Sequence, residues 1–348
     1  MVDWSIARTL ARLAGGGEGS PHSGLDLPAL CDEMEPHVAE YTGLEPSAPR
    51  PPAEAVSRSE WASTNIDSVA TVLDPVAARL EERLAFAGPL AGALRMGASA
   101  TLAAETGLVM GYVSQRVLGQ YDISLLGGDA PPRLLFVAPN LEKAVRELDV
   151  DALAFGRWVA AHELTHVFQF QGVPWLRDHM SGLLRQYLAT VEVRIDHGTA
   201  GGMPSLPDPR KLVEAFRDGG LAALVQNDAQ RAQMDTIQAA MAVIEGYSEH
   251  VMDVIAERAI PGHENLRAAM TARRQSRSTP ELLVERLLGF DVKLRQYELG
   301  KGFSDAVVDE AGIDGLNRVW ASPRALPTLA ELSEPAGWLE RTAPDKAA

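Results

Sequence analysis

The sequence has a single cysteine, no long basic run and no long uninterrupted apolar segment, and each absence excludes a class of protein. Because Cys31 is the only cysteine, the chain can form neither an internal disulfide nor a zinc site built from several thiolates. We expect this thiol to be a small buried side chain. The most apolar stretch, 85–117, is interrupted by Arg95, Glu105 and repeated glycines, so a membrane span is not expected. A formal net charge of −15 disfavours binding to nucleic acid or to anionic lipid.

The N-terminal residues lack the basic start, apolar run and small-residue cleavage site of a secretory signal. Residues 1–13 instead have the pattern of a short amphipathic helix, which is followed by Gly15, Gly16 and Gly17. The simplest expectation is a cytoplasmic protein.

Apolar residues recur at spacings of three and four along most of the chain, which is the pattern of α-helices. Within 61–86 we expect Pro75 to divide the helix or to begin a new one. Residues 90–118 are apolar on most sides and predict a helix packed on all faces. Further helices are predicted at about 151–171, 175–197, 209–225, 229–258, 263–274, 279–300 and 303–320. The fold class is therefore mainly α, with at most a small β-sheet or edge strand near helix 151–171.

The best strand candidate is 133–137, in which Arg133 is followed by the apolar run from Leu134 to Val137. Proline-rich composition marks two further boundaries, at 45–54 and from Ser322 onward. We predict an N-terminal helical segment at 1–44, a main domain at 52–321, and a Pro-rich tail at 322–348 that forms loop with frayed ends.

The segment HELTH, which begins at His162, contains the residues most indicative of chemistry. His162 and His166 are four residues apart, so on a helix both imidazoles lie on one face and can share one zinc ion at about 2.0–2.1 Å each. Glu163 points to the side and can take a proton from a water molecule beside the ion, as a catalytic base. The alternative is a pair of core histidines without a metal, each of which would need another hydrogen-bond partner.

Zinc needs at least one more protein ligand. The arrangement HExxHxxGxxH does not apply, because Gln169 replaces its glycine and Gly172 replaces its third histidine. Glu245, in the helical segment VIEGYSEHVMD, is the preferred candidate. Other candidates are Asp178, His179, Glu192, Asp196 and His197. An ordinary exposed acidic helix face remains the alternative interpretation of Glu245.

Other side chains near Glu245 could support the reaction. Glu249 follows one helical turn later and could accept the free ring N–H of a zinc-bound histidine. Tyr247 and His250 could donate a hydrogen bond to an oxyanion, although the helical spacing does not put Tyr247 on the face of Glu245.

The chain resembles the zincin-like metallopeptidases found mainly in actinobacteria. The resemblance lies in four segments: HELTHVFQF, EGYSEHVMD, MGYVSQRVLGQYD at 110–122 and LLFVAPNL at 134–141. The resemblance is greater to the subgroup named for its association with the biosynthesis of the deazaflavin coenzyme F-420. It implies a mainly helical zincin with His162 and His166 as ligands, Glu163 as base and Glu245 as a gluzincin-like third ligand. The 78 residues between His166 and Glu245 are a departure, since the best-known gluzincins have a much shorter interval.

Two functions remain open besides a metal-free helical interaction protein. The first is a zinc metallohydrolase that cleaves a peptide or amide substrate with Glu163 as base. The second is a zinc-containing accessory or binding protein of a coenzyme pathway that has no peptidase activity. The presence of Glu163 favours the first, because metal binding alone does not need a base at that position.

Overall fold

The computed structural model describes residues 2–17, 19–84, 91–125, 130–190, 228–275 and 290–343. In chain order the elements are α1 (Trp4–Ala14), α2 (Leu27–Thr42), β1 (Ala53–Val56), α3 (Arg58–Leu84), α4 (Ala91–Ser114), β2 (Gly119–Asp122), β3 (Arg133–Val137), α5 (Ala138–Leu148), α6 (Ala152–Gly172), α7 (Leu176–Thr190), α9 (Asp228–Ala259), α10 (His263–Gln275), α12 (Phe290–Leu316), the 3₁₀ turns η3 (Asn317–Trp320) and η4 (Pro323–Ala325), α13 (Leu329–Ser333) and α14 (Pro335–Arg341). The mainly helical fold with a small sheet is thus confirmed.

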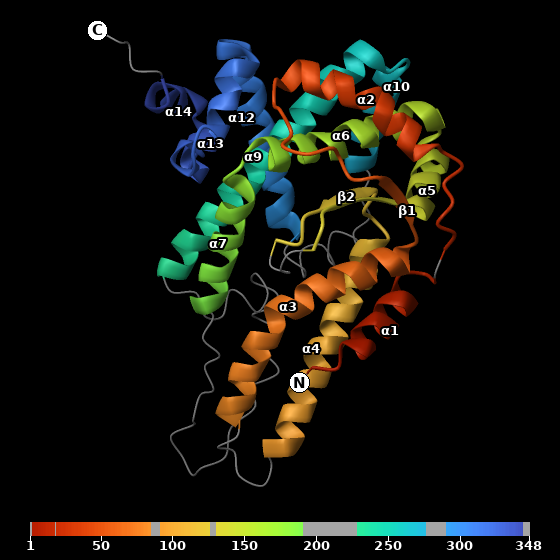
Figure 1. Ribbon diagram of the computed structural model, residues 1–348, viewed down its shortest axis with the longest axis vertical. Helices are drawn as coiled ribbons and strands as arrows, with labels where there is room; N and C mark the ends of the chain where they lie inside the picture. Colours follow the sequence, from red (N-terminus) through yellow and green to blue (C-terminus); the bar gives the residue numbers. More distant parts are fainter. Residues whose placement is uncertain are drawn as a thin grey trace.

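The three strands form one mixed sheet in the order β1-β3-β2. β1 runs parallel to β3, with Ala53 opposite Leu134, and β2 runs antiparallel to β3, with Gly119 opposite Phe136. The apolar run of β3 is central in the sheet, and Figure 1 shows helices on both sides of it. A strand covered on both faces needs apolar side chains in both directions, which accounts for its continuous apolar sequence.

Alternate residues of β3 belong to two separate cores. Leu134 and Phe136 pack into the larger core, which is formed mainly by α2, α6, α9 and α12. Leu135 and Val137 pack into the smaller core with residues of α1, α3 and α4. The small sheet therefore separates two helical layers, and α6 lies directly on one of its faces.

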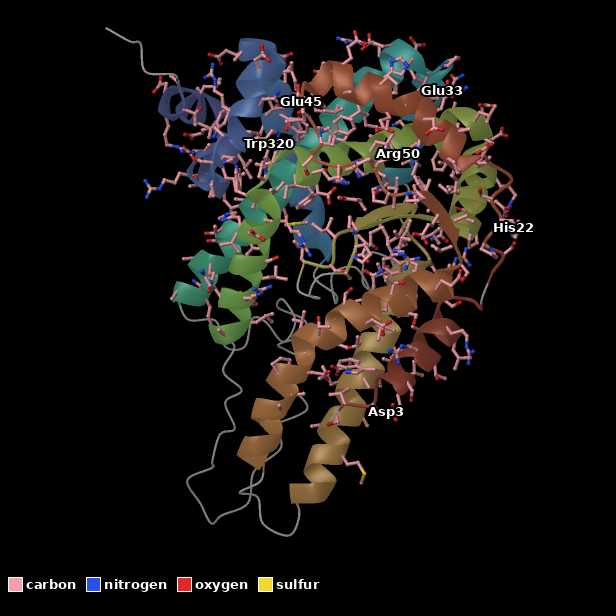
Figure 2. All side chains as sticks on the ribbon, viewed as in Figure 1. Asp3, His22, Glu33, Glu45, Arg50 and Trp320 are labelled. Carbon is pink, nitrogen blue, oxygen red and sulfur yellow. The ribbon has the colours of Figure 1, made fainter. Side chains whose placement is uncertain are left out.

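A capping hydrogen bond stabilises the start of α1, and two ion pairs hold the segment that follows α2. Asp3, labelled in Figure 2, caps α1 by accepting a hydrogen bond from the Ser5 backbone N–H at 3.0 Å. Arg50, also labelled, holds the segment after α2 against that helix through Asp32 and Glu35. Cys31 is fully buried in the larger core, as predicted.

Two predicted helix breaks are wrong. Pro75 lies inside α3, which continues to Leu84, because the loss of one backbone hydrogen bond bends a long helix without ending it. The predicted break near residue 302 is also absent, and α12 is kinked at Gly312 instead. Gly312 has a φ of 69°, a left-handed conformation that glycine adopts without strain.

Strands β1 and β2 were not predicted from the sequence. Each has only four residues, and β2 contains the polar sequence GQYD, so neither shows a clear period of two. Both are held by backbone pairing to β3, a long-range contact that the side-chain pattern does not reveal.

The tail is not loop throughout, in contrast to the prediction. It forms η4, α13 and α14, and the Trp338 side chain is fully buried. The Trp338 indole donates to the Ala325 carbonyl at 2.7 Å, and its ring contacts Phe303 edge-on at a centroid distance of 5.1 Å. Burial of one large aromatic group offsets the cost of ordering this short proline-rich segment.

The expectation that 90–118 forms a helix packed on all faces is also wrong. Met96 is 73% exposed and Leu108 is 53% exposed on α4. Small residues of α4 instead allow α1 to pack closely against this helix. A β-carbon at Gly107 would lie 2.5 Å from the Ala7 carbonyl oxygen of α1. The predicted helix 209–225 lies outside the described residues, as do the end of 175–197 and the start of 279–300.

Among the described residues, no helix combines the length and the apolar character needed to cross a membrane.

Candidate metal centre

Helix α6 presents the two histidines of HELTH side by side. The helix is capped by Asp151, whose carboxylate accepts a hydrogen bond from the Ala154 N–H at 2.7 Å. His162 Nε2 and His166 Nε2 are 3.2 Å apart, and the two ring planes are nearly perpendicular. The spacing of four residues therefore brings two ring nitrogens to one point, as the sequence predicts.

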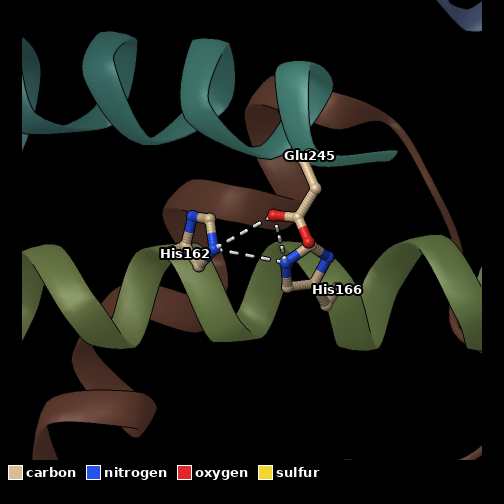
Figure 3. Close-up of side chains that lie close together, drawn as sticks. All are labelled: His162, His166 and Glu245. Carbon is tan, nitrogen blue, oxygen red and sulfur yellow. Dashed lines mark hydrogen bonds and ion pairs between the residues drawn. The ribbon is translucent and has the colours of Figure 1, made fainter. Parts of the chain in front are cut away.

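Glu245 of α9 completes this group. Its Oε2 lies 3.8 Å from His162 Nε2 and 3.6 Å from His166 Nε2 (Figure 3). In Figure 3 the carboxylate comes from the helix facing α6 and points between the two rings. Among the residues that the structure describes, these three form the group of His, Cys, Asp and Glu side chains with metal-binding spacing.

The separations of the three ligand atoms fit a tetrahedral ion. Two atoms bound at about 2.1 Å from one ion in tetrahedral geometry lie about 3.4 Å apart. The three distances of 3.2, 3.6 and 3.8 Å lie close to this value. Two imidazoles and one carboxylate are a usual ligand set of catalytic zinc, and they leave a fourth position open.

The acidic groups around His166 stabilise a positive charge on or beside its ring. Burial lowers the pKa of the imidazole, but the hydrogen bond and the negative charge of Glu245 outweigh burial and raise it above its ordinary value. Glu245 thus favours a positive charge at His166, whether it is a proton or a metal ion.

Glu163 is buried between α6 and β2. Burial raises the pKa of its carboxyl to about 7, with His166 and the Tyr121 backbone N–H opposing this and Glu245 adding to it. The Gly119 backbone lies against the same side chain, and a β-carbon there would be 2.7 Å from Glu163 Oε1. Strand β2 therefore holds this carboxylate in place by a backbone hydrogen bond and by close contact.

An apolar cleft of about 640 Å³ opens onto these groups. Its volume is in the range of ligand-binding pockets. The polar lining includes His162, His166, Glu163, Glu245 and Glu249. The apolar lining consists mainly of Trp61, Val113, Val117, Leu118, Ile123, Leu125, Trp158, Val159, Phe170, Met241, Ile244 and Met252. The three candidate metal ligands and the buried Glu163 therefore line one mainly apolar cleft.

Comparison with known proteins agrees with this arrangement. Residues 2–339 match the zincin-like metallopeptidases. The chain belongs to this family. A crystal structure from Chloroflexus aurantiacus, described as a presumed hydrolase with a novel fold, is similar over 100% of both chains, with 30% sequence identity and a TM-score of 0.72. The comparison with curated proteins finds no match.

Two of the rival candidate ligands, Asp178 and His179, do not join the group of His162, His166 and Glu245. Asp178 and His179 lie on α7, where the His179 ring contacts Trp175 at a centroid distance of 5.7 Å, and neither lines the cleft. Glu192, Asp196 and His197 lie outside the described residues.

The structure does not bring the two predicted oxyanion donors to the cleft. The Tyr247 hydroxyl donates to Asn317 at 2.8 Å, and the His250 ring nitrogens bond to Tyr41 and Asp305 at 2.7 Å each. Positions two and five residues after Glu245 point about 200° and 140° away from it on a helix, so both side chains face other parts of the core.

Glu249 lines the cleft one turn after Glu245, and its role as a hydrogen-bond acceptor for a ligand histidine stays a prediction. His166 has a different partner, since its Nδ1 lies 2.8 Å from Gln169 Oε1. In the sequence, Gln169 is evident only as a departure from the motif HExxHxxGxxH. Because His166 and Gln169 are three residues apart on a helix, their side chains are neighbours, and this spacing could have identified the hydrogen bond from the sequence.

Proposed function

We propose that this protein is a zinc-dependent peptidase in which His162, His166 and Glu245 hold the metal and Glu163 is the catalytic base. The observation that carries the proposal is the spacing of the three ligand atoms beside a buried carboxyl group. Family membership and the similarity to a presumed hydrolase support the same reaction class. A third ligand from a separate helix is the gluzincin-like arrangement that the sequence predicts.

Bound zinc supplies Lewis-acid chemistry, in that it polarises a carbonyl group and makes a water molecule more acidic. Glu163 accepts the proton of the attacking water at its carboxylate and delivers it to the leaving amine. In the absence of a metal ion, burial raises the pKa of this carboxyl to about 7, which makes it a stronger base than an exposed glutamate. The Tyr121 backbone N–H orients the carboxylate for this transfer.

The cleft fits a peptide substrate with apolar side chains. Residues such as Trp61, Trp158 and Phe170 line the approach to the metal ligands and would bury such side chains while excluding bulk water. Glu249 in the same cleft is proposed to accept the free N–H of the His162 ring, which would fix its orientation toward the ion.

The decisive experiment has two parts. Metal analysis of the purified protein should give one zinc per chain, and peptide libraries with apolar residues should be cleaved. Glu163→Gln should keep the zinc but lose about 10²–10⁴-fold in kcat/KM, because the amide cannot accept the proton. Glu257→Gln, the same change at an exposed position of α9, is the matched control and should leave kcat/KM unchanged.

A zinc-loaded wild type that cleaves no more than Glu163→Gln on every peptide would contradict the peptidase proposal. That outcome would favour the accessory-protein alternative. Absence of bound zinc would contradict both.

A further inference from the structure

Gln169 connects the two helices that carry the metal ligands. It lies on α6, three residues after His166, and is fully buried. Its Oε1 is 2.8 Å from His166 Nδ1. Its Nε2 is 2.8 Å from the backbone carbonyl oxygen of Ile244, the residue before Glu245 on α9. Both ends of the amide are therefore used, one at a ligand and the other beside a ligand.

The Ile244 carbonyl determines the direction of these hydrogen bonds. A carbonyl oxygen can only accept, so the Gln169 NH₂ group must face it and donate. The Gln169 oxygen then faces His166, where it can only accept, so His166 Nδ1 must carry a hydrogen. His166 is left with its Nε2 directed at His162 and Glu245. This nitrogen is the one whose lone pair a metal would take.

A buried amide needs such a reason to be retained. Most neighbours of Gln169 on α6 are apolar, among them Val167, Phe168 and Phe170. Burying an unpaired amide costs about 1–3 kcal/mol of folding free energy. An apolar side chain at this position would avoid that cost, so the two hydrogen bonds give the amide a specific role.

We propose that Gln169 is a positioning residue that holds His166 in the Nδ1–H tautomer and directs its Nε2 toward the metal. The proposal rests on the proposed zinc site. Gln169 itself has no contact with metal or substrate, and it acts through His166. Anchoring on the Ile244 carbonyl also fixes α6 against α9 next to Glu245, so one amide sets both the ring orientation and the spacing of the ligand helices.

The test compares three variants for zinc affinity, measured by competition with a chelator, and for the visible absorption spectrum of the Co²⁺-substituted protein. Gln169→Leu removes both hydrogen bonds at similar volume and should lower zinc affinity by about 10–100-fold with an altered Co²⁺ spectrum. Gln169→Glu still accepts from His166 Nδ1 but cannot donate to the Ile244 carbonyl, so it should keep the Co²⁺ spectrum of wild type and bind zinc more tightly than Gln169→Leu. Thr165→Val is the matched control, because it removes another buried side-chain hydrogen bond of α6, from Thr165 to Ala161.

Thr165→Val should change thermal stability but neither zinc affinity nor the Co²⁺ spectrum. If Gln169→Leu behaves in the same way, Gln169 has only a packing role and this proposal is overturned, while the zinc peptidase proposal stands. If Gln169→Leu does not fold, Gln169→Glu decides, since a Co²⁺ spectrum that differs from that of wild type would overturn the proposal. A wild type that binds no zinc would instead overturn the proposed function.

Discussion

Gly119 and Glu163 are in such close contact that a β-carbon at position 119 would lie 2.7 Å from the carboxylate oxygen Oε1. Because Glu163 is buried, it has little room to move away. We expect Gly119→Ala to displace the carboxylate and to lower kcat/KM by about 10²-fold, which is the cost of misplacing a reacting group by about 1 Å. Zinc content should remain that of wild type, since the three atoms nearest to such a β-carbon all belong to Glu163 and none to a candidate ligand.

The matched control for this change is Gly182→Ala. Gly182 lies in α7, and a β-carbon there would have no heavy atom within 4 Å. This variant should be as active as wild type and slightly more stable, by about 0.5–1 kcal/mol. An unchanged kcat/KM in Gly119→Ala would show that the position of Glu163 is not critical.

Glu163 should also reduce the stability of the metal-free protein. Its folded-state pKa of about 7 lies above the ordinary value of 4.5, so the folded state prefers the protonated form. The resulting loss of stability is small below pH 4.5, grows as pH rises and is complete above pH 7. Metal-free Glu163→Gln should therefore be more stable than metal-free wild type by about 2–3 kcal/mol at pH 8, and by less at pH 5.

Urea unfolding of both metal-free proteins at the two pH values measures this difference. Glu257→Gln, at an exposed site of α9, should show no such pH-dependent gain. A constant difference between wild type and Glu163→Gln from pH 5 to pH 8 would contradict the assigned effect of burial.

Glu245 should contribute strongly to metal affinity. Glu245→Gln keeps the shape of the side chain but removes the charge that faces both histidines at 3.6 and 3.8 Å. We expect zinc affinity to fall about 10-fold or more. Because a ligand that binds only the folded state stabilises it, adding zinc should raise the melting temperature of wild type more than that of the variant.

Calorimetric titration with zinc and thermal melts with and without a chelator test this expectation. Unchanged zinc retention in Glu245→Gln would direct attention to Glu249, the carboxylate one turn later in the same cleft.

The part of the site that follows from local geometry could be predicted from the sequence. His162, Glu163 and His166 lie within five residues of one helix, so their relative positions depend only on helical spacing. Glu245 required a further step, because it comes from another helix and 78 residues lie between it and His166. Its place in a helical segment with acidic residues made it the preferred candidate, and the packing of α6 against α9 brought it to the histidines.

The parts that were missed depend on backbone groups and on long-range pairing. The Tyr121 N–H and the close approach of Gly119 exist only because β2 pairs with β3 next to α6. No side-chain pattern in GQYD indicates such a role. Tyr247 was selected by its chemistry alone, although a separation of two residues on a helix directs it away from Glu245.

Asp305 accepts hydrogen bonds from His250 and Lys301 away from the cleft and should make stability depend on acid pH. Burial raises the pKa of its carboxyl, but hydrogen bonds from His250 and Lys301, each at 2.7 Å, outweigh burial and hold the pKa below its ordinary value. A carboxyl with a lowered folded-state pKa stabilises the protein above the unfolded value of 3.8, and this contribution is lost as pH falls through the folded-state value. Asp305→Asn should therefore destabilise the metal-free protein at pH 6, and the difference should shrink below pH 4.

The effect should be about 0.5–1 kcal/mol, because the Asp305 side chain is 42% exposed and solvent screens both interactions. Urea unfolding at pH 6 and at pH 3.5 measures it, with Asp309→Asn, an exposed position of the same helix α12, as control. Equal destabilisation by Asp305→Asn at both pH values would mean that shape, and not charge, accounts for the role of this carboxylate. Since the group lies outside the cleft, kcat/KM at neutral pH should be the same in Asp305→Asn and wild type, which separates this source of pH dependence from that of Glu163.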